Sequence, residues 1–323
     1  MKKAIVAIVA LLCAGALVAC SGGGQDPSST GSPGAPADTA PIDTTQGAEN
    51  TPEAGDGPTA ENTPETMSGK IVVNSREDGS GTRGAFVELF EVVDGDKNDI
   101  TADSAEITNS TAVMMTSVAG DKNAIGYVSL GSLGDTVKAV AIDGVEATTA
   151  NVASGTYKVA RPFFIATVGE PSAQARDFID FIMSSVGQDV IEANGYIRVD
   201  DTGPYAGGGT SGKVVVAGSS SVTPVMEKLK EAYLAVNPAA EIEIQMSDST
   251  TGMNSVIDGI CDICMASRDI KDSEAEKGAE GTRIAIDGIA VIVNRENPIS
   301  GLAKEQVRAI YTGEITDWTQ LGG

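Results

Sequence analysis

The sequence predicts an α/β protein in which helices flank sheets, organised as two domains. Three observations support this prediction. Short β-branched apolar runs alternate with segments that carry apolar residues at helical spacing. The alternation continues through the whole of residues 69–323, which is typical of strands and helices layered together. About 255 residues lie beyond position 68, enough for two modest domains.

The expected elements follow one another along the chain. In the stretch 173–184, for example, Ala175, Phe178 and Ile182 share one helical face. The glycine-rich stretch DDTGPYAGGGTSG, residues 200–212, is typical of a flexible connection. We expect strands at 70–75, 125–130, 137–142, 213–217, 241–246 and 283–294, and helices at 84–90, 173–184, 222–235 and 250–258.

The chain opens with a targeting signal. Two lysines precede an apolar run of about 16 residues that ends in small residues, which is typical of a secretory signal and too short to favour a membrane-spanning helix. Residues 17–20, LVAC, resemble the lipobox of bacterial lipoproteins. The resemblance implies cleavage before Cys20 and a lipid on its sulfur, so residues 1–20 are the expected lipoprotein signal peptide. The alternative is an ordinary signal peptide that contains a cysteine.

An acidic segment follows the signal. Residues 21–68 contain no Phe, Trp or Tyr and no Lys or Arg, and they carry eight acidic residues among Pro, Thr, Gly and Ser. Such a composition cannot bury enough apolar surface to fold, so we expect a disordered tether.

The residue types present exclude several kinds of chemistry. The chain has no histidine, which removes Ser-His-Asp and Cys-His nucleophiles and histidine metal sites. Cys261 and Cys264 form a single C-x-x-C in an apolar setting, which favours structural cysteines in a buried strand; a disulfide and a redox role are the alternatives. A net charge of −23 argues against nucleic acid as a partner.

Three segments share one design, a strand followed by a small hydroxyl-rich turn and then a helix. A helix N-terminus exposes unpaired backbone N–H groups and the positive end of the helix dipole, while Ser, Thr and Gly add donors and allow close approach. One such turn alone is an ordinary helix cap, but three of them, one beside an arginine, favour an oxyanion site. None matches the nucleotide P-loop pattern. The segments are NSREDGSGTRGAF, VVVAGSSSVTPVMEKL and EIQMSDSTTGMNSVI.

These segments, with DICMASRDIK, AIDGIAVIVNRENP and EQVRAIYTGEITDWTQLGG, resemble the phosphate-binding lipoproteins of bacterial phosphate ABC transporters. The resemblance covers nearly all of residues 69–323. It implies a two-domain, type II periplasmic-binding-protein fold that holds one phosphate in the cleft between domains, without metal or cofactor.

The segment order differs from the family pattern. In the family, a segment like GSSSVTP begins the mature protein, and one like YTGEITDW is followed directly by one like KIVVNSREDGSGT. Here GEITDWTQLGG stands at the end and GKIVVNSREDGSGT begins at Gly69, so joining Gly323 to Gly69 would restore the family order. This resembles a circular permutation; a fragment of a tandem array or a misjoined gene are the alternatives.

The resemblance also implies where the chain crosses between domains. The crossings are expected near residues 158–161 and 293–295. One domain is then continuous, residues 160–292 including the junction 200–212, and the other combines residues 69–158 with 294–323.

The resemblance implies the site residues by matching positions. From one domain come Arg76, as a charge-assisted fork, and the donors Ser80, Gly81 and Thr82. The other domain supplies Ser220, Ser221 and Ser249.

One family feature is altered. The family's usual proton-accepting Asp is replaced here by Arg268, which either contacts the anion or pairs with Asp269. Phosphate keeps a proton at neutral pH, so another carboxylate would accept it: Asp287 first, then Asp248, with Asp78 better placed to pair with Arg76. The alternative for Asp287 is that it caps a turn with Gly288.

The resemblance implies an extracytoplasmic receptor, not an enzyme, that delivers inorganic phosphate to the permease of an ABC transporter. We expect a monomer that contacts the membrane only through the lipid on Cys20. The alternatives are a receptor for another tetrahedral oxyanion such as sulfate or molybdate, and a phosphate sensor or surface protein without a transport role. A phosphatase is disfavoured by the missing histidines and by the lack of a clustered carboxylate motif.

Overall fold

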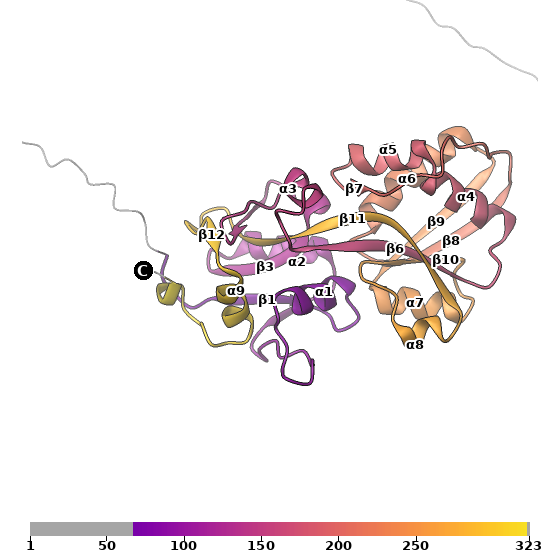
Figure 1. Ribbon diagram of the computed structural model, residues 1–323. Helices are drawn as coiled ribbons and strands as arrows, with labels where there is room; N and C mark the ends of the chain where they lie inside the picture. Colours follow the sequence, from indigo (N-terminus) through magenta and orange to yellow (C-terminus); the bar gives the residue numbers. More distant parts are fainter. Residues whose placement is uncertain (1–66, 322–323) are drawn as a thin grey trace, which may run out of the picture. The chain divides into compact units, whose positions relative to one another are not determined.

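The computed structural model describes residues 67–321. The predicted signal peptide, nearly all of the acidic tether, the lipidation site Cys20 and Gly323 lie outside the described residues. Within these limits, one sheet runs in the strand order β2-β1-β3-β11-β6-β10-β8-β9, with β4 and β7 also paired to β11. Helices cover this sheet around both of its ends (Figure 1).

The first half of the sheet contains β1 (Val72–Arg76), β2 (Glu106–Thr108) and β3 (Ala124–Ser129), with β1 parallel to both neighbours. Side chains alternate across β3 as a pleated strand requires. Ile125 and Tyr127 face α1 (Gly81–Leu89), where the Tyr127 ring stacks on Phe86 at 3.9 Å. Val128 faces α2 (Thr111–Gly120) on the other side. The smaller elements here are η1 (Leu130–Ser132), β4 (Val137–Ala139), β5 (Ala141–Ile142), α3 (Thr149–Ala153), β12 (Gly301–Leu302), α9 (Lys304–Tyr311) and η2 (Trp318–Leu321).

The second half repeats this layering. Strands β8 (Gly212–Ser219), β9 (Ala240–Ser247) and β10 (Ile263–Ala266) run parallel. On β8, Val214 and Val216 face α6 (Thr223–Val236). Ala217 lies on the opposite face with α7 (Ser249–Ile257). The remaining elements are α4 (Ala173–Met183), α5 (Ser185–Ala193), β7 (Ile197–Arg198) and α8 (Asp272–Ala275).

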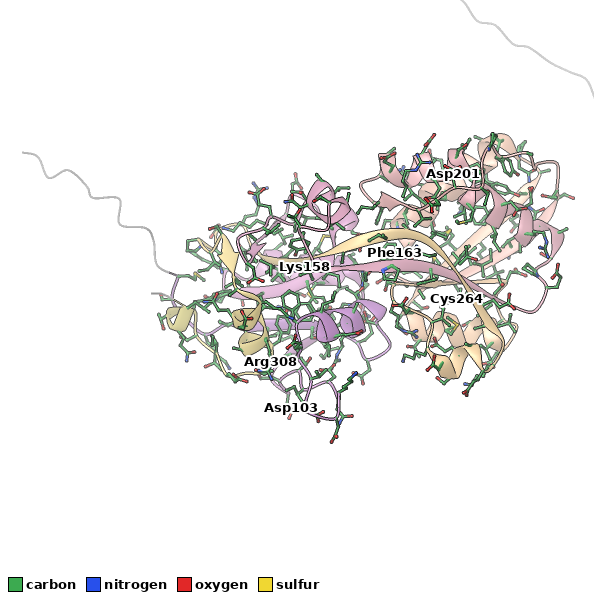
Figure 2. All side chains as sticks on the ribbon, viewed as in Figure 1. Asp103, Lys158, Phe163, Asp201, Cys264 and Arg308 are labelled. Carbon is green, nitrogen blue, oxygen red and sulfur yellow. The ribbon has the colours of Figure 1, made fainter. Side chains whose placement is uncertain are left out.

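Two long antiparallel strands join the halves, β6 (Ala160–Val168) and β11 (Ala279–Asn294). Figure 1 shows them side by side between the two groups of helices, and Figure 2 marks this place by Lys158 and Phe163. Strand β11 pairs with β6 up to Gly288 and with β3 from Ile289 onward. This change of partner precedes the crossing expected at 293–295. The exact domain limits stay a prediction.

The C-terminal segment lies against the first strand of the described chain. The amide of Ile71 donates to Thr316 O at 2.9 Å, and the amide of Trp318 donates to Gly69 O at 3.0 Å. Lys70 also forms an antiparallel bridge with Asp317. The segments around Gly69 and around Trp318 are therefore neighbours, while the circular permutation stays a prediction and Gly323 itself is not described.

The sequence-based elements differ from the structure in several places. The strand expected at 137–142 is two short strands, because Val140 instead donates its amide to Val291 O. Several elements were not predicted: helices α2, α3, α5, α8 and α9, and strands β2, β6, β7 and β12. The glycine-rich stretch 200–212 is not a loose connection, because its Tyr205 and Thr210 donate hydrogen bonds to the buried carboxylate of Asp177 at 2.9 and 2.8 Å.

Candidate anion-binding site

Four helices begin in the same region, at the point where their preceding strands end. Ser80 caps α1 and Ser110 caps α2, each accepting a backbone N–H through its hydroxyl. Asp248 caps α7 with two backbone N–H bonds of 2.8 Å. Helix α6 has a proline in its first turn and no side-chain cap. Because each N-terminus carries the positive end of a helix dipole, the region between them favours an anion.

Buried hydroxyl groups fill this region, and we call them the hydroxyl cluster. Thr82 of the first half lies 2.7 Å from the hydroxyl of Ser221 in the second half. Thr111 lies 3.2 Å from Ser221 and 3.4 Å from Ser220. Hydroxyls both donate and accept, so the cluster can reorient its donors around an anion. Its members are Thr82, Thr111, Ser219, Ser220, Ser221, Ser249 and Ser267, all buried.

A buried arginine borders the hydroxyl cluster. The side chain of Arg76 is 2% exposed, and its Nη2 donates to the Ser220 hydroxyl at 3.0 Å. The same guanidinium forms a two-bond ion pair with Glu77, at 2.7 Å from Nε and 2.6 Å from Nη2. The prediction that Asp78 pairs with Arg76 is therefore wrong. Asp78 points outward and pairs with Arg83.

The glycines at the start of α1 allow its backbone to lie close to side chains of the second half. A Cβ atom on Gly81 would lie 2.5 Å from the Ser249 hydroxyl and 2.8 Å from that of Ser267. A Cβ on Gly79 would lie 2.1 Å from an oxygen of Asp248. The two halves thus meet closely at the start of α1, and only glycine permits this contact.

Arg268 lies beside this contact, and its hydrogen bonds go to Glu274, the backbone oxygen of Asp269 and the Thr250 hydroxyl instead of to the hydroxyl cluster. It pairs with Glu274 through both terminal nitrogens, at 2.9 and 2.7 Å. Burial raises the pKa of Glu274, but the hydrogen bond and charge of Arg268 prevail and lower it. The expected alternative of a pair with the Asp269 carboxylate is wrong, because only the backbone oxygen of Asp269 accepts from Arg268.

Asp287 lies on β11, opposite Arg161 of β6, where these two paired strands pass from one half to the other. One of its oxygens accepts from Arg161 Nη2 at 3.2 Å and the other from the amide of Gly131 at 3.2 Å. Among the hydrogen bonds of the described residues, none joins Asp287 to the hydroxyl cluster. Burial raises the pKa of Asp287, against the opposing charge of Arg161. The backbone N–H that it accepts comes from Gly131, so the alternative of a turn capped with Gly288 is not what the structure shows.

The structure thus brings Arg76, Gly81, Thr82, Ser220, Ser221 and Ser249 together, with Ser80 as the adjacent cap. Sequence reasoning missed Thr111, Ser219 and Ser267 of the cluster, and the charged residues Glu77 and Arg161. A signal existed for Thr111, because EITNSTAVMM has the same strand, hydroxyl turn and helix order as the three recognised segments. No comparable signal marks Arg161, which lies in an ordinary apolar run.

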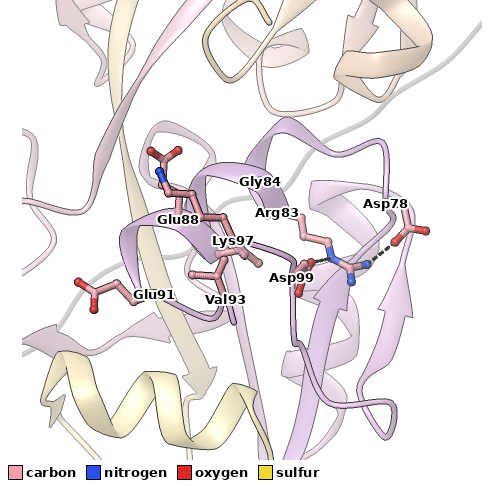
Figure 3. A pocket seen from close by; sticks show the side chains of 9 residues that line it. Asp78, Arg83, Gly84, Glu88, Glu91, Val93, Lys97 and Asp99 are labelled. Atoms are coloured by element: carbon pink, nitrogen blue, oxygen red, sulfur yellow. Dashed lines mark hydrogen bonds and ion pairs between the residues drawn. The ribbon is translucent and has the colours of Figure 1, made fainter. Parts of the chain in front are cut away.

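A wide surface depression lies on the outer side of α1, apart from the cluster (Figure 3). Its lining includes Glu88 and Lys97, together with the ion pairs of Arg83 with Asp78 and Asp99. Arg83 also donates to the backbone oxygen of Arg76 at 2.8 Å, so it holds the site segment in place from outside.

Other chemistry has little basis in the described residues. Between residues 67 and 321, no group of three or more Cys, Asp or Glu side chains is arranged to hold a metal ion. In the same range, no helix has both the length and the apolar character needed to cross a membrane. Cys261 and Cys264 are free and buried, and burial raises the pKa of Cys261 to about 11, which disfavours the reactive thiolate.

Comparison with known proteins shows that the chain is similar in sequence and fold to bacterial phosphate-binding proteins. Residues 61–186 and 203–323 match the family described as the PBP superfamily domain. The chain is 53% identical over 251 residues to the phosphate-binding protein PstS 2 of Streptococcus agalactiae, covering 76% of this chain and 86% of that protein. It is 31% identical over 117 residues to the phosphate-binding protein PstS of Bacillus subtilis, covering 35% and 38% of the two chains.

A solved structure agrees with these relatives. The crystal structure of a phosphate-binding protein of a phosphate ABC transporter from Streptococcus pneumoniae superposes with a TM-score of 0.62 at 43% identity. The superposition covers 78% of this chain and all of the other. The chain therefore belongs to the PBP superfamily and, within it, to the family of bacterial phosphate-binding proteins.

Proposed function

We propose that the protein is an extracytoplasmic receptor that binds inorganic phosphate and delivers it to the permease of an ABC transporter. The observation that carries this proposal is the hydroxyl cluster, built from both halves around four helix N-termini and bordered by Arg76. The relatives that match over most of their length are named as phosphate-binding proteins. The role is that of a solute receptor and not of an enzyme.

In this proposal Arg76 donates a charge-assisted hydrogen bond from Nη1, since its Nε and Nη2 are engaged by Glu77 and Ser220. The hydroxyl and amide donors come from Ser80, Gly81, Thr82, Ser220, Ser221 and Ser249. The net charge of −23 does not prevent binding. Hydrogen bonds act at about 3 Å, whereas diffuse surface charge is screened beyond a Debye length of about 8 Å. Arg76 and Glu77 neutralise each other, so the dipoles of the cluster carry much of the attraction.

Isothermal titration of the purified protein with phosphate, sulfate and molybdate tests this function. Tight binding of phosphate, with much weaker binding of the other two, supports it. Preference for sulfate or molybdate would instead identify a receptor for that oxyanion. Binding of none of them would contradict the proposal.

Selectivity against sulfate requires an acceptor for the phosphate proton, and we propose Asp287 for this role. Its burial near the site and its ion pair with Arg161, which favours the ionised carboxylate, support this role. Asp287→Asn should lower the affinity for phosphate and narrow its lead over sulfate. A variant that keeps the wild-type preference would assign the role elsewhere, with Glu77 beside Arg76 as the next candidate.

The membrane attachment is also a proposal. A lipid on Cys20 would hold the receptor at the outer face of the membrane, with the acidic residues 21–68 as a tether. Cys20→Ala should release the protein from the membrane fraction into the medium. Retention of this variant with the membrane would argue against the lipid anchor.

We further propose that the segment order is a circular permutation of the usual family order. The short match to the Bacillus subtilis protein and the contact of Trp318 with Gly69 support it. The match over 251 residues to the Streptococcus agalactiae protein indicates that this relative has the same segment order as the present chain, so the permutation is proposed relative to proteins such as that of Bacillus subtilis. A rearranged chain that runs from 207 to 321 and continues from 69 to 206 keeps the donors to Asp177 and should fold and bind phosphate. Failure to fold would count against a simple permutation.

A further inference from the structure

A buried ion pair joins the two long antiparallel strands where they pass from one half to the other. Only its aspartate has so far been given a role in phosphate binding. Arg161 on β6 lies directly opposite Asp287 on β11, and the side chains are 2% and 1% exposed. The pair is joined by one hydrogen bond of 3.2 Å, from Arg161 Nη2. Asp287 is fixed in turn by the amide of Gly131, which follows β3.

The rest of the Arg161 guanidinium has no hydrogen-bond partner. Its Nε and Nη1 are buried, and neither donates to any atom of residues 67–321. The guanidinium carbon lies 5.1 Å from the centre of the Phe163 ring, a contact that leaves the N–H groups at its edge free. Buried donors without a partner are strongly unfavourable, so such groups call for a ligand or ordered water.

The other two arginines near the hydroxyl cluster differ in this respect. Arg76 uses Nε and Nη2 on Glu77 and Ser220. Arg268 uses both terminal nitrogens on Glu274 and on Asp269 O. Arg76 and Arg268 therefore spend most of their N–H groups on protein partners, whereas Nε and Nη1 of Arg161 remain free among the described residues.

Arg161 lies at the edge of the site. It lines a groove together with Gly84 of α1 and with Arg268, whose Cγ would lie 3.1 Å from a Cβ on Gly81. The lining of this groove contains no member of the hydroxyl cluster, so the groove adjoins the cluster through α1 and Arg268. Burial lowers the pKa of Arg161, and the nearby positive charge of Arg76 lowers it further, against the charge of Asp287. Each of these two arginines already has a carboxylate partner, Glu77 for Arg76 and Asp287 for Arg161, so the case for a ligand rests on the free N–H groups of Arg161 and not on uncompensated charge.

We propose that Arg161 is a second arginine of the binding site, which donates from Nε and Nη1 to the bound oxyanion while Asp287 holds the guanidinium in place. This inference rests on the proposed function. A planar guanidinium suits two adjacent oxygens of a tetrahedral anion. It also gives the crossing strands a direct part in binding, since Arg161 and Asp287 belong to the two strands that join the halves.

Ordered water is the competing explanation for the free nitrogens. The hydroxyls of Ser129, Ser132 and Tyr196 are also buried and lack partners among the described residues. They lie near the ion pair, because a Cβ on Gly131 would lie 2.3 Å from the Tyr196 ring. A water cluster could satisfy these groups without any contribution from Arg161 to affinity.

Three variants separate these explanations. Arg161→Lys keeps the positive charge beside Asp287 but lacks the planar fork, and Arg161→Gln removes the charge as well. Arg198→Gln is the control, because Arg198 pairs on the surface with Asp189 and Asp201. Titration with inorganic phosphate should show a loss of about 30-fold or more for Arg161→Gln and about 10-fold for Arg161→Lys. The control should stay within about twofold of wild type.

Affinities of both Arg161 variants within about threefold of wild type would overturn the proposal, and Arg161 would then be structural only. Wild-type protein that fails to bind phosphate would instead overturn the proposed function. If the variants do not fold, a crystal structure of the wild type with phosphate decides. A phosphate oxygen within hydrogen-bond distance of Nε or Nη1 supports the inference, and water at both atoms refutes it.

Discussion

Two buried polar clusters in this protein have opposite designs. The hydroxyl cluster draws members from both halves, and its hydroxyls mostly contact one another, as in the 2.7 Å contact of Thr82 with Ser221. The second cluster surrounds Asp177 of α4 and lies entirely in the second half. There a single carboxylate accepts from the hydroxyls of Tyr205, Tyr233 and Thr210 at 2.8–2.9 Å.

The difference lies in the balance of donors and acceptors. Around Asp177 a buried charge is surrounded by matching donors, including the amide of Gly208 at 3.2 Å, so nothing further is needed. In the described residues, the hydroxyls of the cluster bond mainly to one another, and the nearby carboxylate of Asp248 accepts from the backbone of α7 instead of from the cluster. A self-contained cluster stabilises the fold, whereas a donor-rich cluster between two halves is suited to a ligand that supplies the acceptors.

Arg76→Ala should produce the largest change and act on binding alone. Removing a buried partner of a charged ligand typically costs about 2–5 kcal/mol, or roughly 30-fold or more in affinity. Titration with phosphate measures the loss, and circular dichroism checks that the fold is kept. Arg308 on α9, labelled in Figure 2, donates to Glu91 O and Glu314 and to no member of the cluster, so Arg308→Ala is the matched control and should bind like wild type. Near-normal affinity of Arg76→Ala would place the arginine in a structural role with Glu77.

Gly81→Ala should have a smaller effect on the same cluster. Its Cβ would lie within 3 Å of the hydroxyls of Ser249 and Ser267, so the two halves could not close as tightly. We expect about a 10-fold loss of phosphate affinity, or about 1.4 kcal/mol.

Gly84→Ala, one helical turn further along α1, is the control for Gly81→Ala. A Cβ on Gly84 would contact nothing within 4 Å. We expect its affinity to stay within about twofold of wild type, with a gain in stability of up to about 1 kcal/mol. Equal affinities for the two variants would mean that close approach at Gly81 does not matter for binding.

Local patterns predicted the fold class and the three hydroxyl turns, and the family resemblance then implied the individual site residues, which stay a prediction. Apolar periodicity marks strands such as β8, and a hydroxyl turn before a helix marks Ser220, Ser221 and Ser249. The charged residues were harder, because a pairing partner depends on tertiary geometry. Arg76 pairs with Glu77 at the next position, rather than with Asp78.

The two long strands β6 and β11 show most clearly what a sequence alone does not predict. Arg161 and Asp287 are separated by 126 positions and meet only because β6 and β11 pair in one register. Nothing in the local sequence of either residue specifies its partner. The glycine-rich stretch 200–212 misled for a similar reason, since the carboxylate of Asp177 that holds it comes from a helix earlier in the chain.

Asp177→Asn should have the smallest effect on binding and act on stability instead. Hydrogen bonds from Tyr233, Thr210 and Tyr205 lower the pKa of Asp177 although burial opposes them. A group whose pKa is lower in the folded state stabilises the fold above its unfolded pKa of about 3.9, and this contribution is lost as the pH falls through the lower folded value. The variant should therefore be less stable by about 1–3 kcal/mol at pH 7. The difference in stability from wild type should shrink as the pH falls below about 4.

Urea unfolding at pH 7 and pH 3 measures this difference, and phosphate affinity at pH 7 should stay within about twofold of wild type. A large loss of affinity with unchanged stability would mean that the Asp177 cluster serves binding and not the stability of the fold.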